Sequence, residues 1–167
     1  MVCGNLTRGK PTGVIEVEVN GTSRATPAAP DTPIIHVLRN DFGLCATRFG
    51  CGAEQCGACV VLVDGAPEYA CTLRVADAVG RRITTVEGLA RDGEPHPLQR
   101  AFLEEQAAQC GYCVSGMLMR AAALLASEPS PDEAAVRAAL EPQLCRCGAH
   151  NRIVRAVLRA ATTIKAQ

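Results

Sequence analysis

The sequence contains no tryptophan, and aromatic residues make up only 3% of its 167 residues. Hydrophobic residues make up 48%, so the chain can still form a core, built mainly from aliphatic side chains. An excess of basic charge is also absent, because 17 Lys and Arg balance 17 Asp and Glu. General nucleic-acid-binding proteins and polybasic membrane-surface proteins need such an excess, so neither class fits.

Long hydrophobic runs are missing as well. No segment approaches the length of a membrane span, and residues 1–10 lack the apolar centre of a secretory signal. We therefore expect a cytoplasmic protein. The sequence also shows no Ser–His–Asp set, phosphate loop or dinucleotide fingerprint, so we predict no catalytic residue on this chain.

Cysteine, by contrast, is abundant, with ten residues. A secreted disulfide scaffold is usually shorter and has fewer long helical segments. In a reducing compartment, clustered cysteines are more often metal ligands or redox-active thiols. Eight of the ten fall into two sets along the chain, and Cys3 and Cys45 match neither set.

The first set has four, two and eleven residues between its members, which are Cys51, Cys56, Cys59 and Cys71. The first two spacings match plant-type [2Fe–2S] ferredoxins, whose fourth ligand lies further along the chain. Glycines at positions 50, 52 and 57 allow the backbone to pass close to the cluster and aim N–H groups at its sulfides. A structural zinc site, which usually has two C-x-x-C pairs, and a pair of disulfides are the alternatives.

The second set consists of two pairs, Cys110 with Cys113 and Cys145 with Cys147. The 31 residues between the pairs have the pattern of two helices. Antiparallel helices would bring both pairs to one end of a bundle, where the positive charge of helix N-termini favours thiolate ligands. The spacing leaves a zinc site open as a real alternative here.

The two sets lie in halves of different character, and the fold class is therefore α+β. Strands are predicted at 14–19, 22–26 and 60–63, with a return strand at 69–73, and the Asn20-Gly21 turn joins the first two. Helical periodicity dominates after residue 88, with helices predicted at 97–108, 114–125, 131–140 and 153–164. We expect one domain at 13–88, a second at 89–165, and a loosely ordered tail at 1–12.

Three segments resemble sequences of the xanthine oxidase family of molybdenum hydroxylases. CGAEQCGAC at 51–59 resembles the ferredoxin loop of that family, while QCGYC at 109–113 and LCRCG at 144–148 resemble its second motif. The order and spacing of all eight cysteines agree with the family over residues 13–164. Two short segments differ from the sequence found in many members of the family: Val-Ser-Gly at 114–116 and Gly-Ala-His-Asn at 148–151. Within the family, this variant is most similar to the small subunits of isoquinoline and nicotinate dehydrogenases.

The resemblance implies a β-grasp ferredoxin-like domain followed by a four-helix bundle, each holding one [2Fe–2S] cluster through four cysteines. It implies a large partner subunit with a molybdenum–pterin cofactor, where carbon, here of an N-heteroaromatic compound, is hydroxylated with oxygen from water. The helical-domain cluster would lie nearest the molybdenum, and Gln109 and Cys147 match positions that approach the pterin. Electrons would leave to an external acceptor, either a flavin subunit or a cytochrome c.

Two other functions compete with an electron-transfer subunit. One is a free-standing two-cluster ferredoxin, although a mobile carrier has no need of a bundle that covers one cluster. The other is a zinc-stabilised interaction module. For Gln109, the alternative to a pterin contact is a cap on a helix end.

Overall fold

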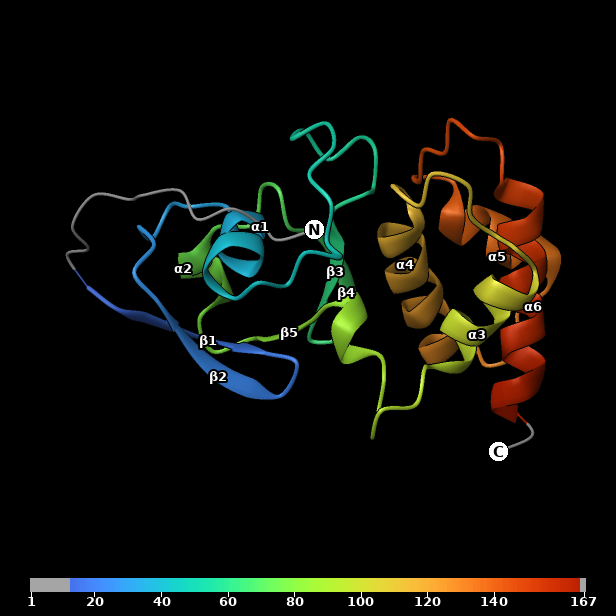
Figure 1. The fold of residues 1–167 in the computed structure, drawn as a ribbon, viewed down its shortest axis with the longest axis horizontal. Helices are drawn as coiled ribbons and strands as arrows, with labels where there is room; N and C mark the ends of the chain where they lie inside the picture. The colour runs from blue at the N-terminus through green and yellow to red at the C-terminus, as the bar shows by residue number, and fades with distance from the viewer. Residues whose placement is uncertain (1–12, 166–167) are drawn as a thin grey trace.

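The computed structural model of this chain describes residues 13–165, and Figure 1 shows a twisted sheet beside a group of helices. The predicted tail at 1–12 lies outside the described residues. The sheet consists of β1 (Ile15–Val19), β2 (Thr22–Thr26), β3 (Val60–Val63), β4 (Ala66–Tyr69) and β5 (Arg82–Thr84), in the order β2-β1-β5-β3-β4. Neighbouring strands are antiparallel except β1 and β5, which are parallel. The predicted mixed α+β class is confirmed.

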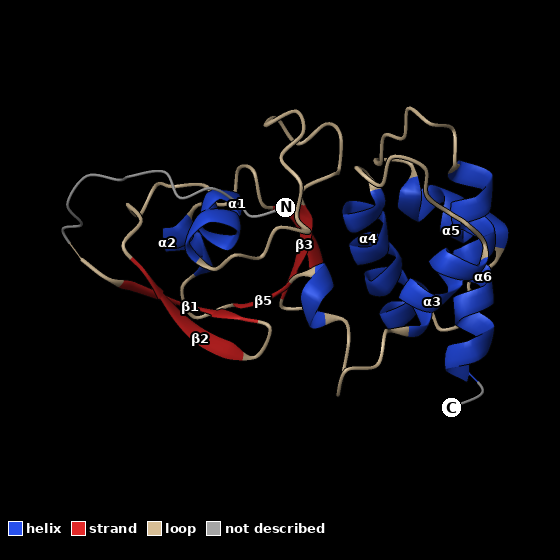
Figure 2. Cartoon of the chain, in the orientation of Figure 1, coloured by secondary structure: helices blue, strands red, loops and turns tan. Residues whose placement is uncertain are grey.

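The β1–β2 hairpin turns at Asn20 and Gly21, whose φ angles of 53° and 74° are the positive values that a tight hairpin turn requires. A short helix, α1 (Ile34–His36), continues as the π-helical turn η1 (Val37–Asp41), and α2 (Val75–Ala78) precedes β5. Figure 2 shows α1 and α2 on the same side of the sheet. Their apolar residues and the facing side chains of β1, β3 and β5 form the first core.

Strand β3 is buried on both faces. Val61 and Val63 belong to the first core, whereas Val60 and Leu62 belong to a second core formed mainly by helices. Successive side chains of a strand point to opposite faces, so an uninterrupted apolar run fits a strand that is covered on both sides.

The second core is formed by four helices that follow the 3₁₀ turn η2 (Val86–Gly88). These are α3 (Pro97–Glu104), α4 (Val114–Ser127), α5 (Glu133–Leu140) and α6 (His150–Lys165). Helix α4 lies against β3 and β4, α5 and α6 pack together, and α3 packs along α6 (Figure 1). The first of the four ends at Glu104, four residues earlier than predicted.

One predicted strand was misplaced. The return strand runs over Ala66–Tyr69 and not over 69–73, because the turn at Asp64 and Gly65 pairs Val63 directly with Ala66. Cys71 therefore lies beyond the end of β4 and not within the strand.

Helix α3 begins with a capping box in which His96 takes the N-cap position. The Nδ1 atom of His96 accepts a hydrogen bond from the Leu98 N–H at 3.2 Å, and the Gln99 side chain accepts one from the His96 N–H at 2.8 Å. Gln99 also donates to the Val86 carbonyl at 3.3 Å, which ties the helix to the segment that leaves the sheet. This cap requires a neutral imidazole, because a protonated Nδ1 cannot accept.

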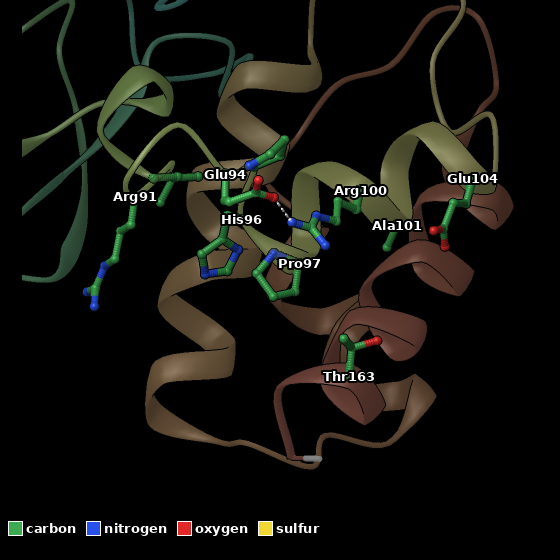
Figure 3. A pocket seen from close by; sticks show the side chains of 10 residues that line it. Arg91, Glu94, His96, Pro97, Arg100, Ala101, Glu104 and Thr163 are labelled. Atoms are coloured by element: carbon green, nitrogen blue, oxygen red, sulfur yellow. Dashed lines mark hydrogen bonds and ion pairs between the residues drawn. The ribbon is translucent and has the colours of Figure 1, made fainter. Parts of the chain in front are cut away.

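A surface cleft of about 470 Å³ lies beside this cap, and none of its lining residues is a cysteine. Figure 3 shows His96 in this cleft, with Arg91, Glu94, Arg100 and Glu104 among the other lining side chains. Arg100 forms an ion pair with Glu94. The two arginines and two glutamates balance in charge, so the cleft has no net preference for an ionic ligand.

Acid should weaken the His96 cap. Burial, assisted by the positive charge of Arg91, lowers the pKa of His96 in the folded chain. The stability that this cap contributes is therefore complete above the unfolded-state pKa of about 6.5 and is lost as the pH falls from there through the lowered folded-state pKa. We expect the melting temperature of the cluster-loaded chain, measured anaerobically, to fall as the pH is lowered from about 7 to about 5.

Two variants test whether His96 causes this fall in melting temperature. His96→Asn provides a cap that does not titrate, so it should flatten this part of the pH profile. His96→Ala removes the cap, which costs about 1 kcal/mol and should lower the melting temperature by about 2–4 °C near neutral pH. An identical pH profile in the Asn variant and the parent would contradict the assignment.

Candidate metal centres

The first cysteine set lies on a loop that directs backbone N–H groups at sulfur. The N–H groups of Ala53 and Gln55 donate to Cys51 Sγ at 3.4 and 3.3 Å, and the Cys51 N–H donates to Cys56 Sγ at 3.3 Å. The Ala53 N–H is the main cause that lowers the pKa of the Cys51 thiol to about 7. Donors placed in this way stabilise negative charge on a ligand sulfur.

The other two thiols of this set meet where the β3–β4 hairpin closes. Cys59 lies just before β3 and Cys71 just after β4, and the Ala70 N–H donates to the Cys59 carbonyl at 3.3 Å. Burial raises the pKa of Cys59 to about 12, and the neighbouring Cys71 side chain adds to the rise while the Cys71 N–H opposes it. Such a buried pair of thiols becomes ionised when a metal binds it.

The second set is brought together by the ends of two helices. Cys113 is the N-cap residue of α4, and Cys145 and Cys147 lie in the loop that leads into α6. Burial, followed by the Cys145 side chain, raises the pKa of Cys113 to about 12. The Tyr112 N–H, followed by a hydrogen bond with the Cys147 side chain, lowers the pKa of Cys110.

The eight thiols therefore meet as four pairs. The thiols interact two by two: the Cys56 side chain acts on the pKa of Cys51, Cys71 on that of Cys59, Cys147 on that of Cys110, and Cys145 on that of Cys113. Among residues 13–165, no three His, Cys, Asp or Glu side chains surround one point closely enough to hold a single metal ion. Structural zinc needs four donors around one ion, whereas a [2Fe–2S] cluster takes two thiolates on each of two irons. Two pairs per set fit the two-iron cluster.

Gln109 lies on the surface between α3 and α4, directly before the exposed Cys110. Helix α3 ends with Glu105 as its C-cap and α4 begins with Cys113 as its N-cap, so Gln109 caps neither helix. Tyr112 is 49% exposed on the same loop, and Leu144, beside Cys145, is 63% exposed. The second set thus lies next to accessible polar and apolar side chains.

Sequence reasoning missed the contacts that join the two sets. Four hydrogen bonds, called here the bridging hydrogen bonds, run from the helical half to carbonyl oxygens next to the first set. They are Leu144 N–H to Cys56 O at 3.1 Å, Ser115 Oγ to Ala58 O at 3.3 Å, Tyr112 Oη to Phe49 O, and Gln143 Nε2 to Gly57 O at 3.1 Å. The last belongs to the orientation of the Gln143 amide that satisfies both of its neighbours. The only sequence signal was that each donor lies within two residues of a cysteine of the second set.

A ferredoxin-like sheet and a group of helices, each with two pairs of thiols, define an iron–sulfur protein with two cluster-binding domains. Residues 17–82 match a family described as "2Fe-2S iron-sulfur cluster binding domain", and residues 85–158 match one described as "[2Fe-2S] binding domain".

Two similar proteins are components of known enzymes. One of the subunits of nicotinate dehydrogenase from Pseudomonas putida is 50% identical over 89% of this chain and 95% of its own length. The alpha subunit of isoquinoline 1-oxidoreductase from Brevundimonas diminuta is 43% identical over 89% of this chain and 97% of its own length.

Solved structures agree. A chain of quinoline 2-oxidoreductase from Pseudomonas putida 86 superposes with a TM-score of 0.87 at 35% identity, covering 92% of this chain and 96% of that one. Aldehyde oxidoreductase from Desulfovibrio desulfuricans gives the same TM-score and identity, but the match covers only 17% of that longer chain.

The chain belongs to the iron–sulfur subunits of the xanthine oxidase family of molybdenum-dependent hydroxylases. It is thus an electron-transfer subunit of an oxidoreductase and carries domains for two [2Fe–2S] clusters. None of the helices within residues 13–165 is long and apolar enough to cross a membrane.

The loaded chain should contain about four irons and four sulfides and show two distinct EPR signals after reduction. The signals should differ because one set receives backbone N–H bonds on an exposed loop and the other lies at helix ends. Iron, sulfide and zinc analysis with low-temperature EPR checks this expectation. Stoichiometric zinc without sulfide would refute it.

Proposed function

We propose that this chain relays electrons from a molybdenum–pterin site on a large partner subunit, through its two [2Fe–2S] clusters, to an external acceptor. When bound to the partner, that cofactor supplies the hydroxylation of a carbon centre with oxygen from water. The observation that carries the proposal is the convergence of eight thiols as two pairs at each of two places. Backbone N–H groups lower the pKa of Cys51 and Cys110 and so favour the thiolate form that binds metal.

The cluster ligands are assigned from this pairing. Each iron takes one thiol pair, and each cluster takes the two pairs of one set. The ferredoxin-type cluster is held by Cys51, Cys56, Cys59 and Cys71, and the helical-domain cluster by Cys110, Cys113, Cys145 and Cys147.

The helical-domain cluster is the one that faces the molybdenum site in this proposal, with Gln109 and Cys147 as the pterin contacts. Gln109 is exposed and its position is set by the adjacent ligand Cys110. Its amide offers both donors and an acceptor, which suits the polar edge of a pterin. Cys147 is half-buried and contacts Cys110, so its sulfur lies close to the same surface.

The partner's substrate is proposed to be an N-heteroaromatic compound. Nicotinate, isoquinoline and quinoline, which give three similar enzymes their names, are all of this class. The residues that would select a substrate belong to the partner. A flavin subunit or a cytochrome c would accept the electrons from the ferredoxin-type cluster, whose ligand Cys51 is exposed.

The proposed fold has two domains, one for each cysteine set. Residues 13–88 form the β-grasp ferredoxin-like domain and residues 89–165 the four-helix bundle domain of the family. The sheet order with parallel β1 and β5, and the packing of α3 to α6 around one core, support this division. A cytoplasmic location is part of the proposal, because a reducing compartment keeps all eight ligand thiols available.

A free-standing ferredoxin and a zinc-stabilised module are the competing functions. Affinity purification of the tagged chain from its native host separates all three. Recovery of a large molybdenum protein with substrate-dependent reduction of both clusters supports the proposal. A monomeric iron–sulfur protein, or a zinc protein without sulfide, would reject it.

Substitution of one ligand should damage one cluster. Cys71→Ser should remove the EPR signal of the ferredoxin-type cluster and about two of the four irons, and Cys145→Ser should do the same for the helical-domain cluster. The reason is that the thiols that act on Cys59 and on Cys113 belong to the same set as the thiol on which they act. Survival of both signals in either variant would show that the ligand assignment is wrong.

Gln109→Ala should leave both clusters assembled but slow their reduction by substrate in the complex. Loss of one hydrogen bond to the pterin would account for a decrease of about tenfold. Rapid-mixing absorbance at the iron–sulfur bands measures the rate. Glu128→Ala, an exposed change at the far end of α4, serves as the control, and equal rates in the two variants would rule out a role for Gln109.

A further inference from the structure

Gln143 is a polar side chain buried at the junction of the two cysteine sets, with only 2% of its surface exposed. One orientation of its amide satisfies both neighbours: Nε2 donates to the Gly57 carbonyl at 3.1 Å, and Oε1 accepts from Arg120 Nε at 2.8 Å. A buried site that demands one donor and one acceptor at once fits an amide, since a carboxylate only accepts and an ammonium only donates.

Gln143 is linked to both cysteine sets, to the first by its hydrogen bond and to the second by its place in the sequence. Gly57 lies between Cys56 and Cys59 of the first set, and Gln143 itself lies two residues before Cys145 of the second. The intervening residue, Leu144, donates its N–H to the Cys56 carbonyl at 3.1 Å. Two successive residues beside one set thus bond to two successive carbonyls beside the other.

Arg120 extends the contact to the fourth ligand of the first set. Its guanidinium donates to the Tyr69 hydroxyl at 2.9 Å and lies 5.4 Å from the centre of that ring. Tyr69 ends β4, two residues before Cys71. Arg120 belongs to α4, the helix that Cys113 caps, so one hydrogen-bonded chain touches segments that carry ligands of both sets.

Close packing at this point depends on two glycines. Gly57 has a φ of 74°, and a Cβ atom there would collide with the Gln143 side chain. A Cβ atom at Gly116, on α4, would collide with the Gly57 carbonyl oxygen and lie 2.9 Å from the Gln143 side chain. The absence of side chains lets the helix and the loop approach until the amide spans them.

We propose that Gln143 is the positioning residue that fixes the two clusters of this chain relative to one another. The inference rests on the ligand assignment of the proposed function. It adds that the spacing of the clusters, and therefore their interaction, depends on an amide that binds neither cluster. A residue that merely filled the core would affect stability and leave that interaction unchanged.

The test uses the full-length chain with both clusters reduced. The magnetic interaction between the clusters is measured as splitting and faster spin relaxation in low-temperature EPR, together with iron content. Gln143→Leu keeps the volume and removes both hydrogen bonds, whereas Gln143→Glu keeps the acceptor for Arg120 and loses the donor to Gly57. We expect both variants to retain two signals with a reduced splitting.

Two further variants separate positioning from general stability. Gly116→Ala should force α4 away from Gly57 and reduce the same splitting without any change at position 143. Gln99→Leu removes the capping-box amide of α3, so it should lower the melting temperature and leave the splitting as in the parent. If the Gln143 variants lose a cluster, the splitting in Gly116→Ala becomes the test: a reduced splitting supports the proposal and an unchanged splitting contradicts it.

The possible failures are distinguishable. A parent chain without two iron–sulfur signals would contradict the ligand assignment itself. Three results would overturn the role of Gln143 alone. The parent could show two signals that do not interact, or the splitting could be unchanged in Gly116→Ala and in both Gln143 variants. The third is a splitting that decreases in Gln99→Leu as much as in the Gln143 variants.

Discussion

The structure depends on the hydrogen bonds that the helical half donates to carbonyl oxygens next to the first cysteine set. The backbone N–H groups of the first loop that donate to sulfur cannot also donate to these oxygens. A buried carbonyl oxygen without a donor costs free energy, so the donors must come from elsewhere in the chain. The accepting oxygens belong to residues 49, 56, 57 and 58, and the donors to residues 112, 144, 143 and 115, in that order. The same hydrogen bonds therefore satisfy the carbonyl groups of the first loop and hold the two cysteine sets next to each other.

This constraint also explains why the sheet and the helices are packed so closely. Val60 and Leu62 turn one face of β3 toward α4, while Val61 and Val63 face the first core. Both faces of the strand that follows Cys59 are thus held in place. The glycines at 57 and 116 then bring the helix axis close enough for side chains to reach the loop. The helical half thus contacts the carbonyl side of the first cysteine loop and leaves Cys51 exposed.

The arrangement suits a protein that carries electrons and leaves bond chemistry to a partner. Eight thiols occur as pairs at two places, and the fold around them has two packed cores. Backbone donors near cysteine sulfurs are one way in which a protein tunes the potential of a redox centre. Exposed groups near Cys110 leave the second set accessible to a partner, and exposure of Cys51 does the same for the first.

The sequence alone determined the two cysteine sets, the mixed α+β class and the family, because ligand spacing and hydrophobic periodicity are local properties that the chain displays directly. It misplaced β4, since only the observed register shows that the turn at Asp64 and Gly65 starts the strand at once. Tertiary structure alone decided how the thiols pair and which residues join the sets. Gln143 has no local signature, because a buried amide acquires its partners only when the chain folds: they are a carbonyl 86 residues earlier and an arginine of α4.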